Sequence, residues 1–157
     1  MLYATTSRKP SVCTKRLCRL LCSLLPASSY ENRGKKSIED VVERARSLGC
    51  SRILIFSEEH GNPRSIRAIN TNGEWSWHPV EILMRKIEIG EKAGMPKLIR
   101  ATGKNSGLFS ELFMIGDSEG GVPALLKAGE NKLEFEYAKK TPLSFEFEVV
   151  RHEEAEM

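Results

Sequence analysis

Basic side chains are concentrated near the start of this 157-residue chain. Residues 1–36 contain eight Lys or Arg residues and a single acid, Glu31, so this segment carries a net charge of +7. The whole chain carries only +3, so the other 121 residues carry −4. Guanidinium and ammonium groups are the side chains that bind phosphate, and a polarised charge distribution attracts a polyanion to one end of a molecule. We therefore expect this segment to bind a phosphate-rich partner.

The residues expected to bind lie in two short loops and on one helix between them. They are Ser7, Arg8, Lys9, Lys15, Arg16, Arg19, Arg33, Gly34, Lys35 and Lys36. The first three precede a helix whose free N–H groups favour a phosphate, and the next three share one sector of that helix. Gly34 permits close backbone approach in the second loop. Solvated surface charge is the alternative interpretation, and single-surface binding requires the two loops to lie close together.

The periodicity of the first half predicts the elements that hold these residues. Segment 2–6 is β-prone, and Ser11 is placed to cap a helix that Pro26 ends. Residues 26–36 have loop composition, and Ser37 with Asp40 predicts a second capped helix. The sequence then predicts a strand at 52–58, an HGNP turn and a strand at 64–70.

The second half is richer in strands. Asn72-Gly73 is a strong hairpin signal, and Ser106 is placed to cap a short helical turn. A strand is predicted at 82–89, with a short helix as the alternative interpretation. Further strands are predicted at 97–102 and, with clear alternation, near 133–137 and 143–149. The expected fold class is α/β, in one domain of two related halves, about 1–72 and about 73–152, with an acidic tail at 153–157.

Four ordered motifs resemble the Brix domain, in particular its short single-domain archaeal members. They are TTSRKPS, the basic amphipathic helix, NRGKKS before a capped helix, and a strand ending in E-x-HGNP. Together they cover about residues 3–70, and the second half is compatible in length and strand content. The resemblance implies two strand and helix halves similar to the anticodon-binding domain of class IIa aminoacyl-tRNA synthetases.

The resemblance also implies a role in ribosome biogenesis. An RNA-binding factor would bind ribosomal RNA precursors and assist rRNA processing and subunit assembly without catalysis. Guide RNA-protein particles or other assembly factors would be further partners, with no membrane, small-molecule substrate or cofactor, in the cytoplasm. One alternative is a protein-interaction adaptor whose basic patch holds an acidic partner, and another is a tRNA-binding module.

Other residue types predict structure rather than chemistry. The cysteines at 13, 18, 22 and 50 form no CxxC pair and have no nearby His, so we expect no zinc site and thiols that react only after unfolding. His60 has no evident nucleophile to activate, which argues against catalysis. Trp75 and Trp77 either stack on unpaired bases or form one face of a core sheet, and the core is the preferred interpretation.

Acidic and glycine-rich segments complete the expectations. Glu134, Glu136, Glu146 and Glu148 alternate out of the last two strands, which favours a solvated or partner-facing negative surface over a metal site. The loops GKNSG and GDSEGG lack the spacing of nucleotide-binding loops. Arg19 interrupts the apolar stretch that imitates a signal peptide, so we expect no cleaved leader and no membrane span.

Overall fold

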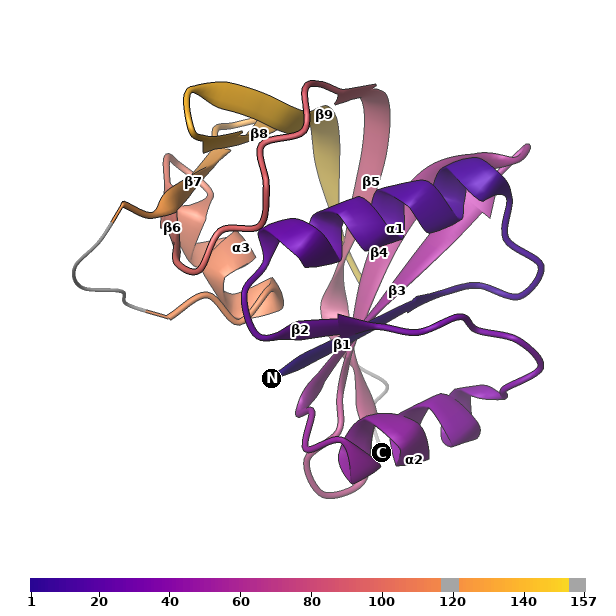
Figure 1. The fold of residues 1–157 in the computed structure, drawn as a ribbon. Coiled ribbons are helices and arrows are strands. Elements are labelled where there is room, and N and C mark those ends of the chain that lie inside the picture. Colours follow the sequence, from indigo (N-terminus) through magenta and orange to yellow (C-terminus); the bar gives the residue numbers. More distant parts are fainter. Residues whose placement is uncertain (117–121, 153–157) are drawn as a thin grey trace.

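A single mixed β-sheet organises the chain (Figure 1). The computed structural model describes residues 1–116 and 122–152, and in these ranges nine strands are ordered β2-β1-β3-β4-β5-β9-β8-β7-β6. The strands are β1 (Leu2–Thr6), β2 (Ser28–Tyr30), β3 (Arg52–Glu59), β4 (Asn62–Asn70), β5 (Ser76–Ile89), β6 (Ile99–Thr102), β7 (Ala124–Ala128), β8 (Lys132–Tyr137) and β9 (Lys140–Arg151). The helices are α1 (Val12–Leu24), α2 (Ile38–Ser47) and α3 (Ser106–Leu112). The α/β fold class is confirmed.

Helices cover both faces of the sheet in its first half. Leu17 of α1 and Phe109 of α3 belong to one continuous core, whereas Val41 of α2 belongs to a second core on the opposite face. Strand β3 separates the two cores, since Leu54 contributes to the first and Ile53 to the second. Burial on both faces explains why residues 53–56 are continuously apolar rather than alternating. Figure 1 shows α1 and α2 on opposite sides of β1 and β2.

The two halves of the sheet show the same succession of parallel and antiparallel strand pairs. In the first half β1 pairs in parallel with β3, and β3, β4 and β5 then follow in antiparallel order. In the second half β6 pairs in parallel with β7, and β7, β8 and β9 follow in antiparallel order. The two series meet where β5 pairs with β9. This arrangement supports the proposal of two related halves, and it groups β5 with the first half rather than with the expected segment after residue 72.

Two of the predicted helix caps are confirmed in atomic detail, whereas Ser106 is the first residue of α3 instead of its cap, and the N-cap Asn105 forms no side-chain capping bond. The Ser11 side chain accepts a hydrogen bond from Thr14 N at the start of α1, and Ser37 and Asp40 form a reciprocal capping box at the start of α2. Gly49, expected just after α2, has a φ of 76°, which favours glycine. These local signals succeed because each depends on residues within one helical turn.

Three strand predictions need correction. Strand β2 lies in the segment expected to be loop, since three residues are too few to show alternation. Strand β7 was not predicted, because its sequence ALLKA is poor in the β-branched and aromatic residues that favour strands. Strand β5 begins at Ser76, well before the expected start. The Gly-rich loop GDSEGG at 116–121, apart from Gly116, and the acidic tail at 153–157 lie outside the described residues.

The tryptophan pair is not a core pair, which corrects the preferred interpretation. Trp77 is 36% exposed, and its ring lies under the Arg67 guanidinium at 4.8 Å. Trp75 packs partly against the second core and meets Trp77 edge-on at 6.3 Å between ring centroids. We therefore expect Trp77→Ala to cost about 1 to 2 kcal/mol in urea unfolding, from lost area and the cation–π contact. A loss above about 3 kcal/mol would instead indicate a core position.

The cysteines differ in exposure, so the expectation that every thiol reacts only after unfolding is wrong. All four are free, Cys18 and Cys50 are buried, and Cys13 is exposed on α1. Burial raises the pKa of the Cys18 and Cys50 thiols, which further lowers their reactivity. With N-ethylmaleimide and peptide mass mapping, we expect Cys13 to be alkylated in the folded protein and Cys18 and Cys50 only in denaturant. Protection of Cys13 in the native state would contradict this prediction.

Candidate nucleic-acid interface

The two basic loops lie side by side, as the sequence analysis required. Arg33 in the second loop donates from Nη1 to Thr6 O, which directly precedes the first loop, at 3.0 Å. Its Nε donates to Lys36 O at 2.8 Å, which closes the second loop on itself. Figure 1 shows the chain after β1 and the chain after β2 running to the same side of the molecule. The prediction that the loops are adjacent is confirmed.

Arg33 itself needs correction as a predicted phosphate contact. The residue is only 6% exposed, and burial lowers the pKa of its guanidinium. Two of its donors are already used on backbone carbonyls inside the protein. The side chain therefore joins the two loops and is not available to a phosphate.

The N-terminus of α1, which was expected to offer free N–H groups to a phosphate, already has a carboxylate next to it. The Glu58 carboxylate, from β3, accepts hydrogen bonds from Ser11 N at 2.9 Å and from Thr14 Oγ1 at 2.6 Å. These bonds lower the pKa of Glu58, so the helix start already holds an anion. Phosphate binding by the first loop would therefore rest on its side chains rather than on the helix dipole.

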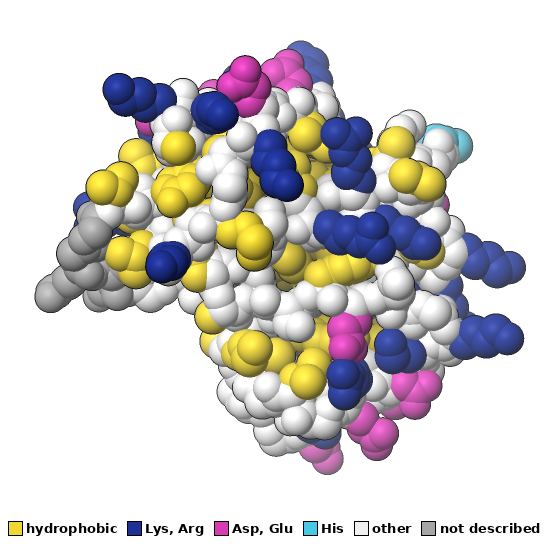
Figure 2. Space-filling model, viewed as in Figure 1, with side chains coloured by type: hydrophobic (Ala, Val, Ile, Leu, Met, Phe, Trp, Pro, Cys, Tyr) yellow, Lys and Arg dark blue, Asp and Glu magenta, His cyan; other side chains and the backbone are white. Residues whose placement is uncertain are grey.

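The remaining predicted residues are accessible to solvent. We call Lys15, Arg16 and Arg19 of α1 the basic ridge; Arg16 and Arg19 are exposed and Lys15 is half-buried. The other members are the exposed Arg8, Lys9, Gly34 and Lys35 and the half-buried Ser7 and Lys36. Figure 2 shows Lys and Arg side chains gathered on the side where α1 and the two loops lie. A surface of this kind suits a chain of phosphates.

The one acid of the segment is held by internal partners. Glu31 accepts hydrogen bonds from Arg44 at 2.8 and 2.9 Å and from the Tyr3 hydroxyl at 3.0 Å. These contacts, led by the Arg44 bonds, lower the pKa of Glu31 to about 2. The carboxylate borders a polar hollow of about 520 Å³ that Arg19 and Lys36 also line. Glu31 thus adds little uncompensated negative charge beside the basic ridge.

The lowered pKa of Glu31 predicts an acid-sensitive fold. The folded state binds this proton more weakly than the unfolded state, whose carboxyl has a pKa near 4.5, so the stabilisation is complete above pH 4.5. It is lost as the pH falls from about 4.5 to about 2. We expect Glu31→Gln to make the free energy of unfolding less dependent on pH in this window. Arg44→Gln should have the same effect, and an unchanged pH dependence in both variants would contradict the assignment.

The predicted negative surface of the second half is a mixed surface instead. Three of its four carboxylates have lysine partners, in the pairs Lys132 with Glu134, Lys127 with Glu136 and Lys86 with Glu146. Each lysine lies on the same strand as its glutamate or on a neighbouring strand. The alternation of glutamates along two strands therefore does not predict these ion pairs. Within the described ranges, no group of three or more His, Cys, Asp or Glu side chains could hold a metal ion.

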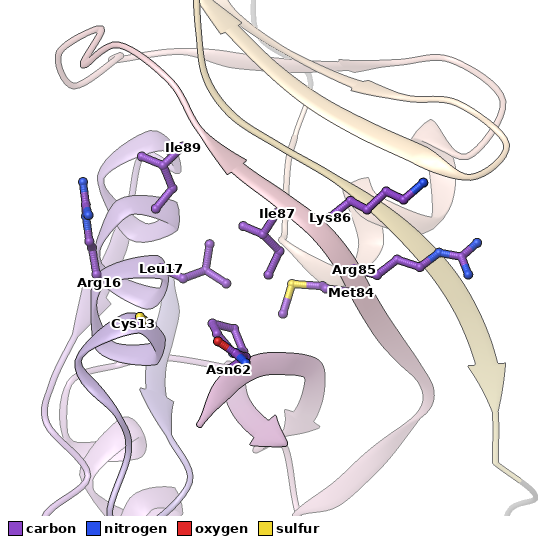
Figure 3. Close-up of a pocket in the computed structure, with 10 residues that line it drawn as sticks. Cys13, Arg16, Leu17, Asn62, Met84, Arg85, Lys86, Ile87 and Ile89 are labelled. Atoms are coloured by element: carbon purple, nitrogen blue, oxygen red, sulfur yellow. The ribbon is translucent and has the colours of Figure 1, made fainter. Parts of the chain in front are cut away.

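A groove beside the basic ridge was not predicted. It has a volume of about 470 Å³ and lies between α1 and the far part of β5 (Figure 3). Its lining includes Cys13, Arg16 and Leu17 from α1 and Met84, Ile87 and Ile89 from β5. No local sequence pattern predicts a groove between α1 and β5, because the two elements are far apart in the sequence. The apolar residues at the end of β5 are a weak signal that this end packs against another element. None of the helices in the described part of the chain is both long and apolar enough to cross a membrane.

Several known proteins are similar in sequence to part of this chain, although no family model matches it. The probable Brix domain-containing ribosomal biogenesis protein of Methanothermobacter thermautotrophicus is 35% identical over 95 residues, 59% of this chain and 58% of that protein. The proteins of the same description from Thermococcus kodakarensis and Saccharolobus solfataricus are 35% and 40% identical over 78 and 65 residues. These matches cover 49% and 41% of this chain, and only 38% of each of those two relatives.

Solved structures extend the similarity to nearly the whole chain. A probable ribosomal biogenesis protein from Aeropyrum pernix superposes with a TM-score of 0.74 at 19% identity, over 99% of this chain and 97% of that one. The chain is similar to Brix domain-containing ribosomal biogenesis proteins over part of its sequence, and to an archaeal ribosomal biogenesis protein in its fold. Mil, an archaeal Imp4-like protein, superposes on this chain with a TM-score of 0.72 at 23% identity, over 96% of this chain and 99% of that one. At these identities both structures show the fold that this chain shares with them rather than its ligands.

Proposed function

We propose that this chain is a Brix domain that binds ribosomal RNA precursors and assists their processing and assembly into subunits without covalent chemistry. The observation that carries the proposal is the joining of the two basic loops by Arg33 beside the basic ridge. This contact holds the two basic loops next to each other, which supports a single binding surface for the cations of residues 1–36. The sequence relatives, which are described as ribosomal biogenesis proteins, support the biological setting.

Phosphate binding would be the main source of affinity. Lys15, Arg16 and Arg19 lie within about one turn of α1, where their side chains contact one stretch of RNA backbone. The loop residues Arg8, Lys9 and Lys35 extend this surface past the start of the helix. Contacts of this type position an RNA by its shape and charge and carry little sequence information.

The setting and partners of the domain follow from the same proposal. Free thiols fit a reducing compartment, which supports the cytoplasm. Assembly factors or guide RNA-protein particles would meet the domain on the same precursor particles. The similarity to the anticodon-binding fold of aminoacyl-tRNA synthetases belongs to this proposal too, and it suggests tRNA as the competing RNA.

Crosslinking in the source cells tests the proposal against both alternatives. The native protein would be crosslinked to RNA, purified under denaturing conditions and the bound RNA sequenced. We expect reads from ribosomal RNA precursors, and co-sedimentation with precursor particles that RNase abolishes. Reads dominated by tRNA would favour the tRNA-binding module, and RNase-resistant association without crosslinked RNA would favour the adaptor.

A further inference from the structure

The groove beside the basic ridge has an apolar interior. Figure 3 shows Leu17 of α1 and Met84 and Ile87 of β5 directed into the space between the two elements, and Arg85 and Lys86 directed away from α1. Asn62 and Pro63, at the start of β4, close another side. The volume of about 470 Å³ falls within the range of about 300 to 1,000 Å³ that small-molecule pockets occupy. The groove is therefore large enough for one planar ring system and its sugar.

One wall of the groove is a strand edge without a neighbour. The last residue pair between β4 and β5 is Ser65 with Leu83, yet β5 continues to Ile89 while pairing with β9 on its other side. Among the described residues, no strand pairs with this edge of β5 beyond Leu83. Arg64 donates from Nη1 to Met84 O at 3.2 Å, which satisfies one carbonyl of the edge. Further backbone groups at such an edge can hydrogen-bond a polar ring, and so can the side-chain amide of the exposed Asn62 in the lining.

The rim of the groove adds positive charge and connects it to the basic ridge. Arg16 lines the groove and forms no ion pair with any residue that the structure describes. A second hollow of about 380 Å³ continues along α1, shares Arg16 and Ile89 with the first, and is bordered by Arg19 and Lys92. No Asp or Glu among the described residues lines either hollow. An occupant should therefore combine an apolar ring with an anionic group.

We propose that the groove holds one unpaired nucleotide of the bound RNA, with its base between α1 and β5 and its phosphate on Arg16. The inference rests on the proposed function, and it adds a site for a base to a surface that otherwise contacts only phosphates. Guanidinium planes and apolar side chains are usual surfaces for an extruded base, and unpaired bases are the usual targets of RNA-binding proteins. A base pair within a duplex cannot enter a groove enclosed on three sides.

Cys13 lies in the groove and is exposed, so its alkylation by N-ethylmaleimide reports occupancy in the unmodified protein. The rate of Cys13 alkylation is measured for the protein alone and in the presence of three saturating ligands. These are an unpaired RNA oligonucleotide of about 12 nucleotides, an RNA duplex, and inorganic polyphosphate of equal charge. We expect the unpaired RNA to slow alkylation about tenfold and the duplex and polyphosphate to slow it less than twofold. Equal protection by polyphosphate would overturn the proposal, because charge alone would then cover the groove.

A matched pair of variants tests whether filling the groove with a larger side chain weakens RNA binding. Cys13→Leu adds bulk at the groove, whereas Val12→Leu adds it at the neighbouring position, which is 82% exposed and outside the lining. We expect Cys13→Leu to weaken binding of the unpaired oligonucleotide about tenfold without changing polyphosphate affinity, and Val12→Leu to change neither. Unchanged RNA affinity in Cys13→Leu would overturn the nucleotide site while the phosphate surface stands. Failure of the unmodified protein to bind any RNA would overturn both proposals.

Discussion

Replacing Lys15, Arg16 and Arg19 together by Ala is expected to lower the affinity for unpaired RNA about a hundredfold at about 0.1 M salt. If about five cations meet phosphates in the unmodified protein, the logarithm of the binding constant falls with log salt at a slope of roughly −3.5, about 0.7 per contact. Loss of three contacts should make the slope shallower by about 2. Fluorescence anisotropy titrations at four or more salt concentrations measure both quantities.

The triple variant should still fold. Helix α1 packs through Leu17, Leu21 and Leu24, which are buried, whereas the three replaced side chains lie toward solvent. A charge-matched control replaces Lys104, Lys127 and Lys132, which lie in the second half of the sheet order and pair with glutamates there. The control should keep the slope of the unmodified protein. A folded ridge variant with unchanged affinity and slope would refute the ridge as the binding surface and would favour the adaptor.

Arg33→Ala is expected to lower the free energy of unfolding by about 3 kcal/mol. Two charge-assisted hydrogen bonds are lost, and their two carbonyl acceptors are left without a donor. Part of the loss would also come from the methylene groups of a side chain that is almost completely buried. Urea unfolding followed by circular dichroism gives the value. The same variant should weaken RNA binding, because the two loops would no longer be held together.

Lys35→Ala is the matched control for Arg33→Ala. It removes one positive charge from the same loop, but the Lys35 side chain is exposed, so the free energy of unfolding should change by less than about 0.5 kcal/mol. Arg33→Ala with the stability of the unmodified protein would show that Arg33 does not link the loops. Arg33→Lys should recover little of the loss, since an ammonium cannot reproduce the two donors of the guanidinium at their separate carbonyls.

The contrast between Arg33 and the basic ridge shows what the sequence could predict. The polar sector of α1, its Ser11 cap and the capping box at Ser37 depend on neighbours within a turn, and all of them are found in the structure. The partner of Arg33 is 27 residues away and that of Ser11 N is 47 residues away. A side chain in a basic loop looks the same in the sequence whether it faces solvent or a buried carbonyl, so only the fold separates the two roles.

The groove and the tryptophan pair depend on strand register. Sequence alternation predicts which residues share a face, but it does not tell where β4 stops pairing with β5, and that point opens the groove. Trp77 pairs with Ile69 of β4, yet α2 covers Ile69 and leaves Trp77 partly open to solvent. Whether a strand face is covered depends on helix placement across the sheet, which no local pattern encodes.

The central pairing of β5 with β9 bears on how the protein is made. Strand β9 is the last described strand along the chain, and its pairs with β5 join residues between 54 (Ile89 with Leu143) and 71 (Val80 with Arg151) positions apart. During translation, the edge of β5 that pairs with β9 therefore has no neighbouring strand until β9 has been synthesised. Pairings of such long sequence separation form slowly. Until then β5 would present an apolar strand to solvent on the translating ribosome, a species that chaperones bind.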